Sequence, residues 1–261
     1  MMATALRPGT AAKVPVPAIG RAVQVLDALS GGRAPMTVSD LARACGLAKS
    51  SVSDLVWSLA ASAMVREVDR GWVLGYRVLE LGQSALSSTD LISEFQRLTP
   101  RLPALGDETV LIGVLDGMDV LYLARHNGNQ PVRLGADIGR RLPAGVTALG
   151  KAMLAALPEA EREDWLRRVE HMPRLTAHSF ATVDQLRADL AETGRRGYAI
   201  DNQQNTRGIN CYGAAILGYR QPTAVSVTLL SSRVTPELIE RLTTDILALA
   251  RQLAGAPRSA G

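Results

Sequence analysis

Residues Gly145 to Lys151 have the spacing of a phosphate-binding loop, G-x-x-x-x-G-K. Such a loop cradles phosphates with backbone N–H groups and needs a following Ser or Thr to bind Mg²⁺. Here Ala152 occupies that position, and the preceding residues 139–144 are not the hydrophobic strand that feeds such a loop. We therefore expect no nucleotide site, but the start of a helix with Thr147 near its N-terminus.

Residue types that perform metal or covalent chemistry are scattered along the chain. His126, His171 and His178 lack the spacing of metal ligands, and no serine lies in a Gly-x-Ser-x-Gly motif. Cys45 and Cys211 are far apart and form no CxxC motif, which argues against a disulfide framework or a zinc site. We therefore expect no metal, no cofactor and no catalytic residue, and a buried, inert thiol at Cys211.

A third type of chemistry, contact with DNA, is suggested by a helical segment that begins near Lys49. Its first turns carry the polar residues Lys49, Ser50, Ser51 and Ser53. The apolar residues Val52, Leu55 and Leu59 define the opposite, buried face. The polar side chains could therefore reach base edges and phosphates, although an ordinary solvated helix face has the same pattern.

Two further helices are predicted before this segment. The first has an apolar stripe and ends at Gly31-Gly32; the stripe consists of Ile19, Ala22, Val23, Leu26 and Leu29. The second begins at the capping signature Thr37–Asp40 and ends at Gly46, which forms a tight turn before the polar helix. Two short helices that flank a glycine turn are typical of a helix-turn-helix.

A short hairpin is predicted after the polar helix. Residues 65–68 and 72–74 alternate apolar and polar side chains around Asp69-Arg70-Gly71. The hairpin completes a winged helix-turn-helix, and we expect Arg66 and Arg70 of this wing to contact phosphates. Residues 1–85 carry a net charge of +3 out of +4 for the whole chain, which suits a phosphate partner.

Two linked helices follow the wing. Their apolar stripe includes Leu79, Leu86, Leu91 and Phe95. This stripe could pack on its own domain or on a second copy of the chain. We favour the second copy, because the small N-terminal module offers little else to bury it, and we expect a homodimer, possibly a tetramer.

The remainder of the chain has the pattern of a mixed α/β domain. Strands are expected at 109–115, 119–124, 131–134, 211–217 and 224–230. Helices are expected at 148–157, 159–169, 183–193 and 236–254. No apolar run is long enough to cross a membrane, and residues 1–18 lack the apolar core of a signal peptide, so we expect a cytoplasmic protein.

Three stretches together resemble the IclR family of bacterial transcriptional regulators. They are LARACGLAKSSV at 41–52, PAGVTALGKAML at 143–154, and GYAID at 197–201 leading to Gly208 and Cys211. The resemblance covers residues 19–255. It implies an α+β chain with an N-terminal winged helix-turn-helix, a linker helix used for dimerisation and a C-terminal GAF-like α/β effector-binding domain.

The resemblance also implies domain bounds and effector-binding residues. The bounds are a tail at 1–18, the DNA-binding domain at 19–77, linker helices at 78–98, the effector-binding domain at 99–255 and a tail at 256–261. The pocket is expected to lie between residues 142–151 and the strands that bear Cys211, Ser226 and Thr228. Its residues are Leu142, Ala144, Gly145, Thr147, Asp201, Cys211, Ser226 and Thr228.

Four positions depart from the family pattern. In the helix that starts at Lys49, Ser51 replaces the usual Thr and Asp54 replaces the usual Arg, so an acid stands where a base is common. Gly145 replaces a His, and Gln204 replaces an acid that often follows Asp201. Because Ala144, Gly145 and Gly213 have little side-chain volume, we expect a ligand with a bulky or aromatic body.

The function expected from these observations is a ligand-responsive transcriptional regulator, not an enzyme. As a dimer it would bind a near-palindromic double-stranded DNA operator and sense a small organic molecule, an organic acid or an aromatic compound. The alternative is a small-molecule sensor or enzyme that uses the α/β domain without binding DNA.

Overall fold

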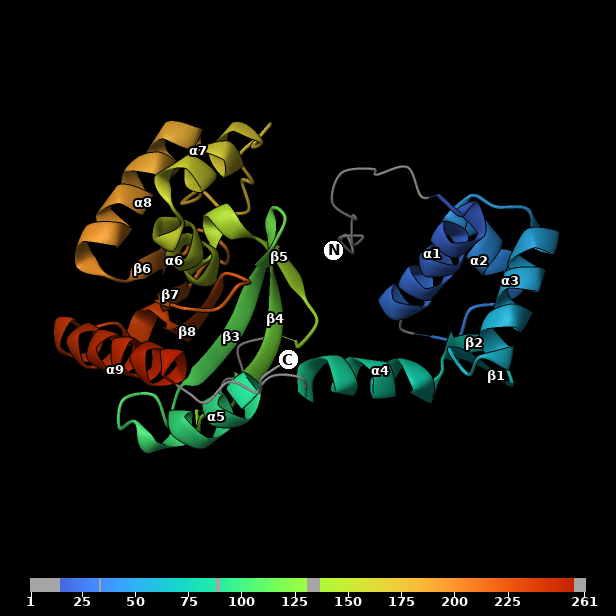
Figure 1. The fold of residues 1–261 in the computed structure, drawn as a ribbon, viewed down its shortest axis with the longest axis horizontal. Helices are drawn as coiled ribbons and strands as arrows, with labels where there is room; N and C mark the ends of the chain where they lie inside the picture. The colour runs from blue at the N-terminus through green and yellow to red at the C-terminus, as the bar shows by residue number, and fades with distance from the viewer. Residues whose placement is uncertain (1–14, 33, 88–89, 131–136, 256–261) are drawn as a thin grey trace. The chain divides into compact units, whose positions relative to one another are not determined.

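The computed structural model describes residues 15–32, 34–87, 90–130 and 137–255. The chain forms two compact units that divide between Ser88 and Thr89 (Figure 1). The predicted strand at 131–134 lies outside the described residues. In the part of the chain that the structure describes, no helix is long and apolar enough to cross a membrane.

The first unit is the predicted winged helix-turn-helix followed by one more helix. Its elements are α1 (Pro17–Gly31), α2 (Val38–Cys45), α3 (Lys49–Ala61), β1 (Val65–Val68), β2 (Gly71–Leu74) and α4 (Tyr76–Ser87). Strands β1 and β2 pair antiparallel, with Val65 opposite Leu74. A small core of apolar side chains from all three leading helices and the wing holds the unit together; it includes Val25, Leu41, Val52, Val56 and Trp72.

Capping residues set the ends of α2. The side chain of Thr37 accepts a hydrogen bond from Asp40 N at 3.2 Å, and the Asp40 carboxylate accepts one from Thr37 N at 3.1 Å. This reciprocal pair satisfies two backbone donors that the helix leaves free. At the other end Gly46 adopts a left-handed conformation with φ of 65°, which glycine tolerates without steric cost. The turn between α2 and α3 thus forms as predicted.

The buried face of α1 differs from the predicted stripe. Val25 and Leu29 are buried, whereas Ile19 and Val23 are 60% and 48% exposed. Both stripes have helical spacing, so periodicity alone did not identify the side that faces the core.

The second unit is built on a six-stranded antiparallel sheet with the strand order β5-β4-β3-β8-β7-β6. The strands are β3 (Thr109–Asp116), β4 (Asp119–His126), β5 (Arg141–Pro143), β6 (Ala199–Asn202), β7 (Ile209–Ile216) and β8 (Thr223–Leu230). Short 3₁₀ turns lie at Thr99–Arg101, Ala144–Val146 and Ser231–Arg233. The predicted α+β class is confirmed, but β5 and β6 were not expected from the sequence.

Helices cover both faces of this sheet (Figure 1). One face packs against α5 (Asp90–Leu98) and α9 (Pro236–Ala254). The other face packs against α6 (Ala148–Ala156), and α7 (Glu159–Arg167) and α8 (Val183–Arg196) contribute to the same core. Alternating residues of each strand therefore enter two different cores.

Helix α5 corrects part of the expected dimerisation stripe. Leu91 and Phe95 are 4% and 0% exposed and pack in the core with α9, so they are not available to a second copy of the chain. Leu79 on α4 is 60% exposed, and the side chain of Leu86 lies outside the described residues. Helix α4 belongs to the first unit and α5 to the second, and the linker bounds 78–98 stay a prediction.

Close contact between α6 and its surroundings depends on two glycines. A Cβ on Gly213 of β7 would lie 2.8 Å from the carbonyl oxygen of Ala148, and a Cβ on Gly150 would lie 2.2 Å from that of Ala144. Neither distance is compatible with a side chain, and both obstacles are backbone atoms. The helix can approach the strand and the preceding turn only because these positions lack a Cβ.

Replacing Gly150 with Ala should therefore destabilise the second unit by about 2 kcal/mol or more, because the new methyl group would overlap backbone that cannot move locally. Calorimetric melting of the full chain measures the effect. Gly194 of α8 is the matched control, since a Cβ there meets nothing within 4 Å, and Gly194→Ala should stabilise by up to about 1 kcal/mol. Equal melting temperatures for the two variants would contradict this packing.

Candidate functional site

The residues predicted to contact DNA lie on α3 and the wing of the first unit. Lys49 and Ser50 are exposed at the start of α3, whereas Ser51 and Ser53 are half-buried at the sides of the helix. Of the four residues predicted to face outward, Lys49 and Ser50 are therefore exposed, whereas Ser51 and Ser53 are only partly exposed.

The two basic residues predicted for the wing differ in their contacts. Arg70 is exposed in the turn between β1 and β2. The Arg66 guanidinium lies over the ring of Tyr76, 5.1 Å from its centre, in a cation–π contact. Trp57 of α3 packs edge-on against Trp72 with ring centres 5.1 Å apart, so this exposed indole braces the wing against α3.

The predicted effector-binding residues of the strands are brought together on the sheet face that α6 covers. Asp201 of β6 lies opposite Cys211 of β7, Cys211 opposite Thr228 of β8, and Thr228 opposite Thr109 of β3. Directly opposed residues share a face, so these four side chains form a polar row across four strands. In the neighbouring row, Ser226 lies opposite Gly213.

Tyr122 of β4 belongs to the same region and was not identified from the sequence. Its side chain is 6% exposed and packs with the core beneath α6. Burial raises the pKa of its hydroxyl, the nearby Cys211 and Asp201 raise it further, and Arg140 opposes them. The phenol is therefore neutral and lies near two residues of the polar row.

Three mostly buried residues of this region have hydroxyl groups that make no hydrogen bond with any described residue. They are Tyr122, Ser226 and Thr109, each at most 7% exposed. Among the described residues, Asp189 Oδ2 is the only buried side-chain polar atom without a hydrogen bond, so these three oxygens are not buried and unsatisfied. Their grouping on one sheet face offers three hydroxyl groups to a polar ligand.

Asp201 is the acidic group of this site, with 1% of its surface exposed. Its Oδ1 accepts hydrogen bonds from the backbone N–H groups of Gln204 at 2.7 Å and Asn205 at 3.2 Å. Burial raises the pKa of its carboxyl to about 6, although Lys151 and the two N–H donors oppose the shift. The carboxyl therefore titrates close to neutral pH.

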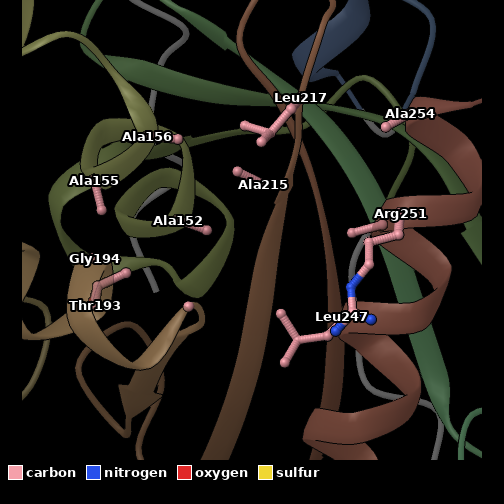
Figure 2. Close-up of a pocket in the computed structure, with 12 residues that line it drawn as sticks. Ala152, Ala155, Ala156, Thr193, Gly194, Ala215, Leu217, Leu247, Arg251 and Ala254 are labelled. Carbon is pink, nitrogen blue, oxygen red and sulfur yellow. The ribbon is translucent and has the colours of Figure 1, made fainter.

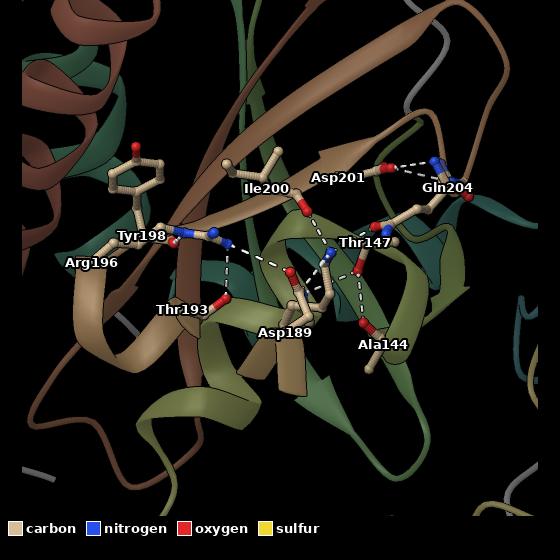
Figure 3. A network of polar contacts seen from close by, with 12 residues as sticks. Ala144, Thr147, Asp189, Thr193, Arg196, Tyr198, Ile200, Asp201 and Gln204 are labelled. Atoms are coloured by element: carbon tan, nitrogen blue, oxygen red, sulfur yellow. Dashed lines mark hydrogen bonds and ion pairs between the residues drawn. The ribbon is translucent and has the colours of Figure 1, made fainter. Parts of the chain in front are cut away.

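The ammonium group of Lys151 has no exposed surface, and its partners Asp189, Ile200 and Gln204 surround it in one polar network (Figure 3). It donates to the Ile200 carbonyl and to Gln204 Oε1, the latter at 2.6 Å. Asp189 Oδ2 of α8 lies 2.9 Å away and forms an ion pair with it. Burial lowers the pKa of Lys151, while the Asp189 carboxylate raises it. Lys151 is thus occupied by internal partners.

The segment from Leu142 to Thr147 contributes to the packing of α6. Thr147 caps α6, as its hydroxyl accepts a hydrogen bond from Gly150 N at 3.1 Å. A Cβ on Gly145 would lie 3.0 Å from Leu186 and 3.8 Å from Trp165. Leu142 is half-buried and Ala144 is fully buried in the core beneath α6.

These placements overturn the argument that small residues open space for a bulky ligand. A side chain added at Gly145 would point toward α7 and α8, and one added at Gly213 would point toward the backbone of α6. Both glycines serve close packing. Neither glycine leaves open space for a bulky ligand.

A groove of about 460 Å³ lies elsewhere in the second unit, between α6, α8, β7 and α9 (Figure 2). Small side chains such as Ala152, Ala156 and Ala215 line it together with Leu217 and Arg251. None of the predicted effector-binding residues lines it.

The chemistry of the polar row is suited to binding. Burial and the neighbouring Asp201 carboxylate raise the pKa of the Cys211 thiol, so it stays protonated, and its sulfur lies 3.4 Å from the Thr228 hydroxyl. Among the described residues, no group of three His, Cys, Asp or Glu side chains could hold a metal ion.

Asp201→Asn should stabilise the protein in a pH-dependent way. The folded-state pKa of about 6 exceeds the ordinary value of 3.8, so folding favours the protonated carboxyl, and stability is lost as the pH rises from about 4 to 6. The variant should match the parent near pH 4 and gain about 1 to 3 kcal/mol at pH 7.5. Melting curves at pH 4 and pH 7.5 measure the gain in stability, and Glu170→Gln, at an exposed position, is the control. An equal gain at the two pH values would contradict the raised pKa of Asp201.

Comparison with known proteins agrees with both units. Residues 18–69 match the IclR helix-turn-helix domain, and residues 83–255 match the C-terminal domain of bacterial IclR transcriptional regulators. The regulator XynR of Escherichia coli is 28% identical over 246 residues, covering 91% of this chain and 97% of XynR. The repressor IclR of the same organism is 27% identical, covering 91% of this chain and 89% of the repressor.

Solved structures show the same similarity. A transcriptional regulator from Rhodococcus sp. RHA1 aligns with a TM-score of 0.80 at 28% identity, covering 92% of this chain and 97% of the other. An IclR homologue from Microbacterium hydrocarbonoxydans complexed with 4-hydroxybenzoate aligns with a TM-score of 0.76 at 23% identity, covering 92% of this chain and all of the other. Because the family matches extend over both units, the chain belongs to the IclR family of bacterial transcriptional regulators.

Proposed function

We propose that this regulator binds a near-palindromic DNA operator as a dimer in the cytoplasm and changes its DNA binding when a small organic molecule occupies the sensing unit. The observation that carries the proposal is the combination, in one chain, of a helix-turn-helix with a polar exposed helix face and a second unit with several hydroxyl groups on one sheet face. We propose no enzymatic role, since the polar row contains no activated nucleophile.

Helix α3 is proposed to enter the major groove. Lys49 and Ser50 are exposed at its N-terminal end, where a recognition helix contacts base edges and phosphates. Ser51 and Ser53 flank them, and Arg66 and Arg70 of the wing supply positive charge for the DNA backbone. Two copies related by a dyad would contact half-sites about 34 Å apart or a multiple of that distance.

Dimerisation is proposed to use exposed apolar residues of the first unit. Tyr76, Leu79 and Leu81 of α4 and Ile19 and Val23 of α1 are each at least 45% exposed. Large exposed apolar patches are unusual on a monomer. A tetramer built from two such dimers is compatible with this arrangement.

The effector is proposed to bind over the polar row on the sheet face beneath α6. Tyr122, Ser226 and Thr109 offer hydroxyl groups that can both donate and accept, and Thr228 and Cys211 lie beside them. Asp201 accepts hydrogen bonds, so it favours a ligand that presents a hydroxyl or amide donor on its side. Among the other predicted contacts, Leu142 is half-buried, whereas Thr147 already caps α6, and Ala144 and Gly145 support the packing.

Lys49→Ala should weaken binding to a fluorescein-labelled duplex taken from the region upstream of the gene. Loss of one phosphate contact should lower the slope of log affinity against log salt concentration by about one. Arg207→Ala, an exposed residue of the sensing unit, removes the same charge and should leave the slope unchanged. If both variants keep the parent slope, Lys49 does not contact phosphate; if the parent itself shows no binding to any genomic DNA, the proposed function fails.

Tyr122→Phe should weaken effector binding by about tenfold without destabilising the free protein, because its hydroxyl has no internal partner to lose. Thermal shift with a panel of hydroxylated aromatic acids, 4-hydroxybenzoate included, first identifies the compound that raises the melting temperature most. Tyr212→Phe removes the same group from the opposite face of the sheet and should bind that compound normally. Equal affinity for the parent, Tyr122→Phe and Ser226→Ala would place the site elsewhere.

A further inference from the structure

Asp54 lies at the centre of the exposed face of α3. Val52 and Val56, both 0% exposed, mark the buried side of the helix. At 100° per residue, Asp54 points about 180° away from the direction midway between them. Ser50 and Trp57, also exposed, lie one turn before and one turn after Asp54 on the same stripe. A helix that enters a groove with this face directs Asp54 to the groove floor.

The carboxylate of Asp54 has no partner among the residues that the structure describes. It makes no hydrogen bond and no ion pair with any described residue; only its backbone carbonyl is used, as the acceptor for the Ser58 hydroxyl at 2.7 Å. The other exposed acid of the helix-turn-helix pair, Asp40, is occupied by Thr37 and Arg43. Asp54 is therefore available for an intermolecular contact.

The chemistry of a carboxylate limits what it can contact in DNA. An ionised Asp only accepts hydrogen bonds, so phosphate oxygens and the acceptor atoms of guanine repel it. The donors in the major groove are the amino groups of cytosine and adenine. Adenine places its N7 acceptor next to the amino group, whereas cytosine offers N4 alone, which makes cytosine the better partner.

We propose that Asp54 is a specificity-determining residue that accepts a hydrogen bond from the N4 amino group of a cytosine in each operator half-site. The inference rests on the proposed DNA-binding function and adds to it the base that α3 reads. It explains how an acid can lie in the middle of a DNA-binding face: the charge lowers affinity for DNA in general and favours sites with a donor at one position.

The test is selection of binding sites from a duplex library with a 30-base-pair random core, using the full chain. The parent should enrich a two-fold symmetric motif with a cytosine in each half-site. Asp54→Ala should lose the preference at that position alone, and Asp54→Asn should shift it to adenine, because an Asn side chain pairs with adenine N6 and N7. Asp27→Ala, which removes an exposed acid from α1, should select the parent motif.

Affinity measurements complete the test on the selected duplex. Replacing the cytosine by 2-pyrimidinone, which lacks the N4 amino group, should weaken binding of the parent about tenfold and leave Asp54→Ala unaffected. The inference is overturned if Asp54→Ala and the parent enrich the same motif, or if Asp54→Ala binds all sequences more tightly by the same factor. If the parent enriches no sequence at all, the result contradicts the proposed DNA-binding function, and the inference about Asp54 is overturned as well.

Discussion

The buried ammonium group of Lys151 is the interaction on which the arrangement of the sensing unit depends. A charged group without exposed surface is tolerated only when other groups replace its water. Here the replacements come from separate parts of the chain: the carbonyl of Ile200 in β6, the amide of Gln204 in the loop after it, and the carboxylate of Asp189 in α8. One side chain of α6 therefore fixes the positions of the edge strand β6, the loop that follows it and helix α8.

This constraint extends to the candidate effector site. The loop that Lys151 holds also supplies the two N–H groups that orient the carboxylate of Asp201. Asp201 begins the polar row that continues through Cys211, Thr228 and Thr109. The glycines at positions 150 and 213 bring α6 close enough for its lysine to reach this loop. Packing and polar chemistry are thus connected through a single helix.

Much of the fold could be predicted from local signals in the sequence. The capping box at Thr37, the glycine turn at Gly46 and the hairpin at 69–71 are each determined by neighbouring residues. Period-two alternation likewise indicated that Ser226 and Thr228 share a face. The four-residue strand β6 escaped notice because so short a segment has little periodicity. Tyr122 was missed because its proximity to Cys211 and Asp201 arises from the order of strands far apart in the sequence.

Features that depend on the choice of packing partner could not be predicted. An apolar stripe shows that a helix face is buried but not what covers it, so Leu91 and Phe95 were assigned to a second copy although α9 covers them. The absent side chains of Gly145 and Gly213 appeared to leave room for a ligand, yet Leu186 and the backbone of Ala148 occupy that space. The family resemblance identified residues of the polar row but not the internal partners that hold them.

Hydrogen exchange of the Gln204 and Asn205 amides tests the central role of Lys151 most directly. Lys151→Met keeps a side chain of similar length but removes the charge that connects α6, α8 and the loop. Our account predicts that peptides covering residues 199–206 exchange at least about tenfold faster in this variant, while peptides of the first unit, such as those covering 65–74, exchange as in the parent. Unchanged protection of residues 199–206 would show that the loop holds its shape without Lys151 and would contradict the account.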